Sequence, residues 1–150
     1  MEIRELNEND LESLIELYEQ LDPSNGNLTM ETSREVWRNE IAPNKNIKYF
    51  GAVDNGKVVS TLYCMIIPNL TSLGRAICFV ENVVTDKDYR KQGLATKLMD
   101  KAVEFAHEHN CYKIMLESSI KRKEAHKFYA DYGFDGDAKK AFIKYFKDKQ

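Results

Sequence analysis

A short segment, Arg90–Thr96, constrains the fold more than any other part of the sequence. It follows an apolar run, Ala76–Val84, that predicts a buried strand. It leads into apolar residues at helical spacing, namely Leu94, Ala95, Leu98, Met99, Ala102, Val103 and Ala106. Gly93 therefore lies in a loop that opens a long helix. The first N–H groups of a helix have no internal partner and carry the positive end of its dipole, so the segment predicts a phosphate site. Arg90 and Lys91 add positive charge, which suits a ligand with several phosphates.

Two motifs resemble those of a known enzyme superfamily. Residues 90–95, Arg-x-x-Gly-x-Ala, are similar to the (Gln/Arg)-x-x-Gly-x-(Gly/Ala) pyrophosphate loop of the GNAT superfamily, the acyl-CoA-dependent N-acetyltransferases. Residues 125–134, Ala-x-x-Phe-Tyr-x-x-x-Gly-Phe, resemble the superfamily's C-terminal helix and follow a predicted strand, Cys111–Glu117. The resemblance covers Phe50 to Phe146, and the segment before it only by the order of its predicted elements.

The remaining patterns predict an α/β (α+β) fold. A short strand and two helices come first: Ile3–Leu6, a stripe from Leu11 to Leu21 after an Asn7 or Asn9 cap, and Thr29–Ile41. Strands Tyr49–Val53 and Val58–Ile67 flank Asp54-Asn55-Gly56, a strong hairpin signal, and a last strand is expected at Phe142–Phe146. The resemblance implies a mixed, mostly antiparallel sheet of six to seven strands flanked by about four helices. Residues 1–150 are expected to form a single domain. The loop Asp22–Asn27 is a candidate mobile cover.

Composition excludes several classes of function. The formal net charge is −2 and the sequence pI is about 6.0, so no basic field points to a nucleic-acid partner. Cys64, Cys78 and Cys111 form no C-x-x-C pair and are expected to be buried thiols of a reducing compartment. No signal-peptide core and no apolar run of about 20 residues is found, so no membrane association is expected and the cytoplasm is the expected compartment. No His, Cys, Asp or Glu set has metal-ligand spacing, and no metal is predicted.

Glu81 is the candidate catalytic base. Only Glu81 and Asn82 interrupt the apolar run Ala76–Val84, and carboxylates are rarely buried without a partner or a function. Burial favours the neutral carboxyl and can prepare it as a base near neutral pH. A strand end or a structural ion pair is the alternative interpretation. The resemblance favours catalysis, because many GNAT enzymes carry on this strand a glutamate that takes the proton from the substrate amine.

Tyr129 is the candidate general acid. It shares a helix face with Ala125, Phe128 and Tyr132, so one interpretation is a core tyrosine packed against the sheet. The superfamily commonly uses the tyrosine of this motif to protonate the departing thiolate of CoA. The resemblance therefore implies a proton donor at Tyr129.

The donor implied by the resemblance is acetyl-CoA. Its pantetheine arm would pair with the backbone of Val83, Val84 and Thr85, where the superfamily's central strands splay. Its pyrophosphate would be bound by Arg90, Lys91, Gln92, Gly93, Leu94, Ala95 and Thr96. Arg122 stands where the superfamily more often has an asparagine, and it is a further candidate contact to CoA.

The acceptor is the least constrained part of the prediction. The cationic run Lys121–Lys123 is either a solvated surface or a binding site for an anion. The chain resembles both glucosamine-6-phosphate and aminoalkylphosphonate N-acetyltransferases, whose acceptors carry an amine and an anionic phosphorus group. The expected acceptor is therefore a small primary amine, anionic in the narrower form of this hypothesis, and a homodimer is compatible with it. The alternatives are a protein lysine or N-terminal acetyltransferase and a non-catalytic acyl-CoA-binding module.

Overall fold

The computed structural model describes residues 1–147, and they divide into two compact units. The first unit spans Met1–Leu116 and the second begins at Glu117. Each unit is described below by itself.

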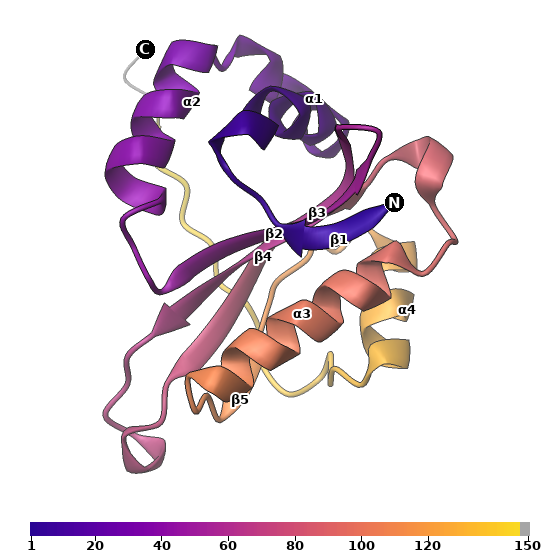
Figure 1. Ribbon diagram of the computed structural model, residues 1–150. Helices are drawn as coiled ribbons and strands as arrows, with labels where there is room; N and C mark the ends of the chain where they lie inside the picture. The colour runs from indigo at the N-terminus through magenta and orange to yellow at the C-terminus, as the bar shows by residue number, and fades with distance from the viewer. Residues whose placement is uncertain (148–150) are drawn as a thin grey trace. The chain divides into compact units, whose positions relative to one another are not determined.

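The first unit is built on one five-stranded sheet in the order β1-β2-β3-β4-β5 (Figure 1). Its strands are β1 (Glu2–Glu5), β2 (Ile47–Asp54), β3 (Lys57–Ile67), β4 (Ile77–Thr85) and β5 (Lys113–Met115). All neighbours are antiparallel except β4 and β5, which pair in parallel. The predicted mixed, mostly antiparallel sheet is confirmed.

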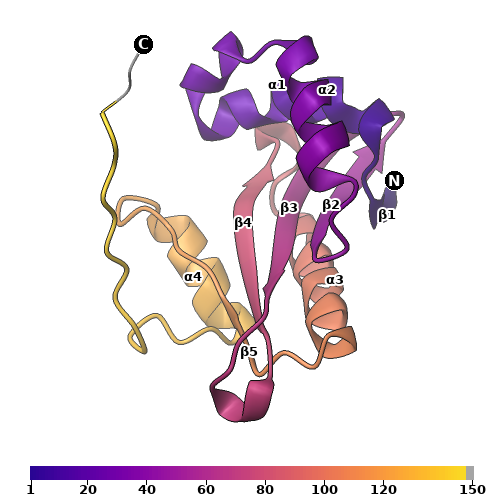
Figure 2. The ribbon, with the colours of Figure 1, turned by 90° about the vertical axis from the view of Figure 1, so that its left-hand side faces the viewer.

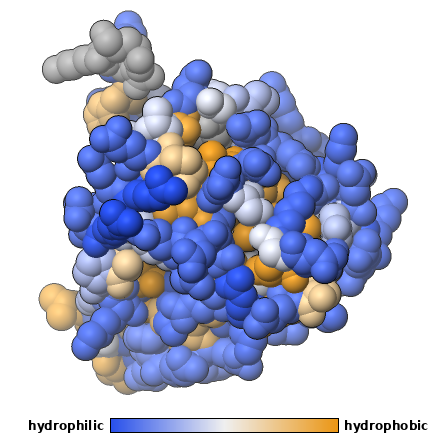
Figure 3. Space-filling view, turned by 45° about the horizontal axis from the view of Figure 1, so that its top comes forward, coloured by the Kyte–Doolittle hydropathy of each residue, from blue (hydrophilic) through white to orange (hydrophobic). Residues whose placement is uncertain are grey.

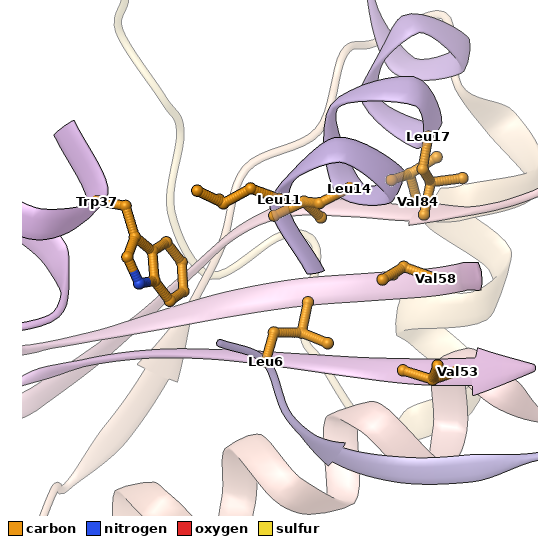
Figure 4. Packing of buried hydrophobic residues seen from close by; sticks show 8 residues of the cluster. All are labelled: Leu6, Leu11, Leu14, Leu17, Trp37, Val53, Val58 and Val84. Atoms are coloured by element: carbon orange, nitrogen blue, oxygen red, sulfur yellow. The ribbon is translucent and has the colours of Figure 1, made fainter. Parts of the chain in front are cut away.

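Helices cover both faces of this sheet. Helices α1 (Leu11–Leu21) and α2 (Met30–Val36) lie on one face, and α3 (Leu94–Glu108) lies on the other (Figure 1). A π-helical turn, Trp37–Ile41, continues α2 to the predicted end of the helix. The core beneath α1 and α2 contains Leu6, Leu11, Leu14, Leu17, Trp37, Val53, Val58 and Val84 (Figure 4). On the α3 side, Leu94 packs against Ala52 and Val59.

Local sequence signals explain where these elements begin and end. The Asn7 side chain accepts from the Asn9 amide, and Asp10 accepts from the Asn7 amide, so a capping box starts the first helical segment. Asn55 and Gly56 have φ of 49° and 80°, which is the left-handed pair that a tight β2–β3 hairpin needs. Thr29 caps α2 by accepting from the Thr32 amide.

The predicted number of strands was wrong. The sheet has five strands, and within residues 1–147 the segment Phe142–Phe146 forms none of them. Phe142 is 86% exposed and Phe146 is 85% exposed, so these side chains gain nothing from burial. The segment has the aromatic residues that are common in strands. A strand also needs a partner edge and a buried face, and the segment has neither in this structure.

The second unit contains one helix, α4 (Lys123–Tyr132), within its described residues. Gly133 follows at φ 117°, and its amide and that of Phe134 both donate to the Tyr129 carbonyl, which closes the helix. The chain after Gly133 continues without regular structure to Lys147 (Figure 2).

The surface on the α1 and α2 side is mainly hydrophilic, with hydrophobic residues visible between the polar ones (Figure 3). Among the helices of residues 1–147, none is long and apolar enough to cross a bilayer. All three cysteines are free thiols buried in the first unit, as expected.

Candidate active site

A β-bulge in β4 sets the position of Glu81. Tyr63 pairs with Glu81 and Thr61 pairs with Val84, so Asn82 and Val83 together face the single residue between Thr61 and Tyr63 on β3. Asn82 has φ of 51°, a left-handed conformation that asparagine tolerates better than most residues. The polar break in the apolar run is therefore a bulge, and it leaves Glu81 half-buried on the sheet face that α1 covers.

Tyr18 of α1 supports this bulge. The Asn82 side chain lies close enough to the Tyr18 hydroxyl to lower the pKa of that phenol. Burial raises that pKa more strongly, with Tyr49 and Tyr63 adding to the rise, so the phenol stays neutral. A neutral, buried phenol of α1 therefore lies next to Asn82, the residue of the bulge with positive φ.

The two strands at the end of the sheet separate close to this bulge. Pairing of β4 with β5 covers Ile77 to Phe79, which face Lys113 to Met115. Residues Glu81–Thr85 of β4 lie beyond that ladder, although they still pair with β3. Within residues 1–147 this part of β4 therefore has no strand partner on the β5 side, although the Thr85 carbonyl accepts from Arg90. An extended ligand chain could pair there, as the resemblance to the superfamily implied for Val83, Val84 and Thr85.

Asp86 organises the loop that follows β4. Its carboxylate accepts from the Asp88 amide at 2.9 Å, from the Gln20 side chain at 3.2 Å and from Lys57 Nζ at 3.2 Å. The bond from the Asp88 amide is the main cause of its lowered pKa, and Lys57 and Gln20 also contribute. The loop is thereby attached to α1 and to the β2–β3 hairpin. Tyr89 adds a second attachment, because its hydroxyl donates to Asp54 at 2.9 Å.

The first turn of α3 presents the predicted anion site. Gly93 has φ of 76° and precedes Leu94, the first helical residue. The first intrahelical bond runs from the Lys97 amide to the Gly93 carbonyl at 3.2 Å, so the amides of Leu94, Ala95 and Thr96 point out of the helix end without an intrahelical acceptor. A Cβ built on Gly93 meets no atom within 4 Å, which leaves the backbone open to close approach.

The two cationic residues of the loop, Arg90 and Lys91, have different surroundings. Arg90 Nε donates to the Thr85 carbonyl at 3.3 Å, so its side chain reaches back to the end of β4. Lys91 is exposed and has φ of 61°, a turn that brings the chain into Gly93. Arg90 thus links the strand that carries Glu81 to the loop that opens α3.

Tyr129 and Arg122 lie in the second unit. Tyr129 is the buried residue of α4, and its ring meets the Phe134 ring edge-on at a centroid distance of 6.0 Å. Arg122 occupies the N-cap position of α4, where its side chain makes no capping bond. The exposed Lys121 and Lys123 flank it. His126 contacts the Ser119 carbonyl at 2.8 Å, so it holds the turn before the helix.

The structure therefore brings most predicted site residues into one continuous region of the first unit. Glu81, Val83, Val84 and Thr85 lie on β4, and residues 90–96 form the loop and the first turn of α3. Sequence reasoning missed Tyr18, Asn82 and Asp86. A signal existed for Asp86, because it is an aspartate directly after an apolar strand. Such an aspartate often caps the next turn by accepting a hydrogen bond from the amide two residues later.

The comparisons with known proteins agree with this geometry. A model of the acetyltransferase (GNAT) family matches residues 11–134. The chain is 32% identical over 136 residues to a glucosamine 6-phosphate N-acetyltransferase from Trypanosoma brucei brucei, covering 89% of this chain and 88% of that protein.

Solved structures give the same result. A candidate acetyltransferase from Agrobacterium tumefaciens str. C58 superposes with a TM-score of 0.88 at 34% identity, covering 97% of this chain and all of the other (100%). A glucosamine-6-phosphate N-acetyltransferase from Arabidopsis thaliana superposes with a TM-score of 0.83 at 26% identity, covering 97% and 98% of the two chains. The chain therefore belongs to the GNAT family of acetyltransferases and is an acyltransferase whose donor is acetyl-CoA.

Proposed function

We propose that this enzyme acetylates the primary amine of a small, anionic metabolite, with Glu81 as the base and Tyr129 as the acid. The observation that carries the proposal is the continuity of β4. This strand carries the half-buried Glu81 at a bulge, and its next residues do not pair with β5. It then leads into the loop that opens α3. A carboxylate that can accept a proton lies on the same short segment as groups that suit a phosphate-bearing, extended donor.

The mechanism follows from what each residue can do. Backbone groups of Val83, Val84 and Thr85 would orient the donor chain, and the amides from Lys91 to Thr96 would bind its phosphates. Glu81 would accept a proton from the ammonium of the acceptor, which frees a lone pair for attack. A backbone N–H at Val83 or Val84 would polarise the carbonyl under attack. Tyr129 would donate a proton to the sulfur that leaves.

The anionic acceptor is supported by two observations. Lys121, Arg122 and Lys123 are consecutive and exposed at the start of α4. A relative with 32% identity over most of the chain is named for an acceptor that carries a phosphate. Arg and Lys at a helix start offer the donors that phosphate or phosphonate oxygens accept.

Turnover of acetyl-CoA against a panel of amines tests the function. The panel contains glucosamine 6-phosphate, glucosamine, aminomethylphosphonate, a polyamine and a lysine peptide. We expect kcat/KM for glucosamine 6-phosphate to exceed that for glucosamine, which lacks the anionic phosphate, by about 10-fold or more. A preference for the lysine peptide would instead assign a protein acetyltransferase. Acetyl-CoA binding without turnover of any amine would assign a binding module.

The Glu81→Gln variant tests the base within the same assay. Glutamine keeps the shape of the side chain but cannot take the proton, so kcat/KM at neutral pH should fall roughly 10²- to 10⁴-fold. Part of the loss should return at alkaline pH, where the free amine needs no base. Equal rates for the variant and the wild type at every pH would make Glu81 a structural carboxylate.

A further inference from the structure

Three side chains form a row across the sheet next to the bulge. Tyr49 of β2 pairs with Tyr63 of β3, and Tyr63 pairs with Glu81 of β4. Direct partners on neighbouring strands point to the same face, so all three lie on the face that α1 and α2 cover. The row ends at the candidate base.

The two tyrosines of the row are stacked. Their ring centroids are 4.5 Å apart and their planes differ by 9°. Tyr49 thus covers one face of the Tyr63 ring. Because Glu81 lies on the opposite side of Tyr63 in the row, the second face of that ring is directed toward β4, and Glu81 is close enough to raise the pKa of Tyr63.

Residues from the helices fix the stack in place. Trp37 of the π-helical turn meets the Tyr49 ring edge-on at a centroid distance of 5.3 Å, and its indole projects over the sheet (Figure 4). Tyr18 of α1 lies close enough to Tyr49 and Tyr63 that both raise its pKa. Burial and the nearby Glu81 carboxylate raise the pKa of Tyr63, so its ring is that of a neutral phenol.

The charges of this arrangement favour a cation. The face of an aromatic ring carries partial negative charge. A carboxylate near that face and the ring itself therefore repel each other. An ammonium group between the two would gain a cation–π contact and an ion pair at once. Tyr63 and Glu81 are both half-buried, so a small ion can reach them from solvent while losing part of its hydration.

We propose that Tyr63, backed by Tyr49, forms with Glu81 the subsite that binds the ammonium group of the acceptor. Tyr63 is then the residue that selects the protonated amine, and Glu81 is the residue that deprotonates it. This inference rests on the proposed function, because it assigns the amine of that reaction to the Tyr63 side of Glu81. It predicts recognition of the cationic head irrespective of what the rest of the acceptor carries.

Tetramethylammonium and tert-butanol make a matched pair of probes. They have similar size and shape, but only the first is a cation, and neither can be acetylated on nitrogen. Trp37, the only tryptophan of the chain, touches Tyr49 and reports on the stack by its fluorescence. Titrations are made at constant ionic strength with sodium chloride as the balancing salt. We expect tetramethylammonium to bind at least about 10-fold more tightly than tert-butanol.

Two variants separate the ring from its hydroxyl. Tyr63→Phe keeps the aromatic face and should bind tetramethylammonium within about 2-fold of the wild type, whereas Tyr63→Leu should lose about 10-fold. Tyr63→Leu should also raise KM for the amine while the affinity for acetyl-CoA is unchanged. Equal binding of the two probes by the wild type would overturn the subsite without any variant, even where Tyr63→Leu does not fold.

The outcomes distinguish the subsite from the reaction. Amine turnover without a preference for the cationic probe would leave the proposed function standing and remove the subsite. Cation binding that depends on Tyr63 without turnover of any amine would keep the subsite and remove the proposed reaction. Competition between tetramethylammonium and the acceptor, but not acetyl-CoA, is the result that supports both.

Discussion

Lys57 Nζ lies 3.2 Å from Oδ2 of Asp86, and this ion pair joins the β2–β3 hairpin to the loop that leads into α3. The Asp86 residue is only 2% exposed, while half of the Lys57 side chain (53%) remains exposed. The carboxylate also accepts from the Asp88 amide and from Gln20, so it is hydrogen-bonded from three segments. Asp86 therefore positions the anion-binding loop without itself being placed to touch a ligand.

Asp86→Ala should loosen this loop. The change removes a cap and leaves several donors unsatisfied, so we expect the free energy of unfolding to fall by about 2 kcal/mol. We also expect KM for acetyl-CoA to rise several-fold, roughly 3- to 10-fold, because loop amides lose their fixed orientation. Urea denaturation and steady-state kinetics measure the two effects. As a control, Lys101→Met breaks an exposed pair with Glu104 and should change neither quantity. A stable Asp86→Ala protein with normal KM would show that the loop needs no such attachment.

Gly93→Asp should abolish acetyl-CoA binding. It places a side chain and a negative charge where the amides of α3 are predicted to bind phosphate. No atom lies within 4 Å of a Cβ at this position, so the fold should survive. Calorimetry of CoA binding, together with a thermal melt, checks both statements.

Gly74→Asp is the matched control for this change. Gly74 has the same φ of 76° and the same empty surroundings, but it lies in the β3–β4 loop. Any strain that aspartate suffers at positive φ is therefore common to both variants. Normal CoA affinity in both would remove the α3 terminus from the site.

The sequence predicted the elements that local signals define. The Asn55-Gly56 hairpin, the helix end at Asp22 and the glycine that opens α3 all follow from backbone preferences of single residues, and all are found. The bulge at Asn82 was visible only as a polar break. Its geometry depends on the register of β4 against β3, which is a tertiary property.

The remaining parts of the site depend on contacts between distant segments. Tyr18 is far from Asn82 in the sequence, because β2 and β3 lie between them. The two residues come together only when α1 packs on the sheet. The sequence around Tyr63 predicts only an aromatic residue in a strand. Its place between Tyr49 and Glu81 depends on the pairing of β2, β3 and β4. The roles of Glu81 and Tyr129 and the single-domain organisation stay predictions.

Tyr129→Phe tests the candidate general acid. The change removes only the hydroxyl, so the packing of the ring against Phe134 is kept. We expect kcat to fall roughly 10²-fold or more while KM for both substrates changes little, as for an interaction made in the transition state. A thioester donor with a more acidic thiol should recover part of the rate. Tyr132→Phe, on the same helix, is the control and should keep full activity. Wild-type kcat in Tyr129→Phe would make Tyr129 a core residue.

The interactions of Asp10 should make the free energy of unfolding depend on pH. Arg4 donates to both of its carboxylate oxygens at 2.8 Å, and the Asn7 amide donates to it at 2.8 Å. The hydrogen bonds from Arg4 are the main cause of its lowered pKa, and the Asn7 amide adds to the effect. In the unfolded chain the carboxyl has its ordinary pKa of about 3.9. A depressed folded pKa means that the stabilising contribution is complete above that value and is lost as pH falls through the folded pKa.

Asp10→Asn should therefore destabilise the protein in a pH-dependent way. At neutral pH we expect a loss of about 1 to 3 kcal/mol, because a charged acceptor for Arg4 is replaced by a neutral amide. The difference between variant and wild type should shrink as pH falls below about 4 and vanish once Asp10 is protonated in both states. Urea unfolding of both proteins between neutral and acidic pH gives this difference directly. Glu104→Gln, which alters an exposed carboxylate on α3, should leave the whole curve unchanged. A difference for Asp10→Asn that stays constant across the range would mean that Asp10 contributes through shape and not through its charge.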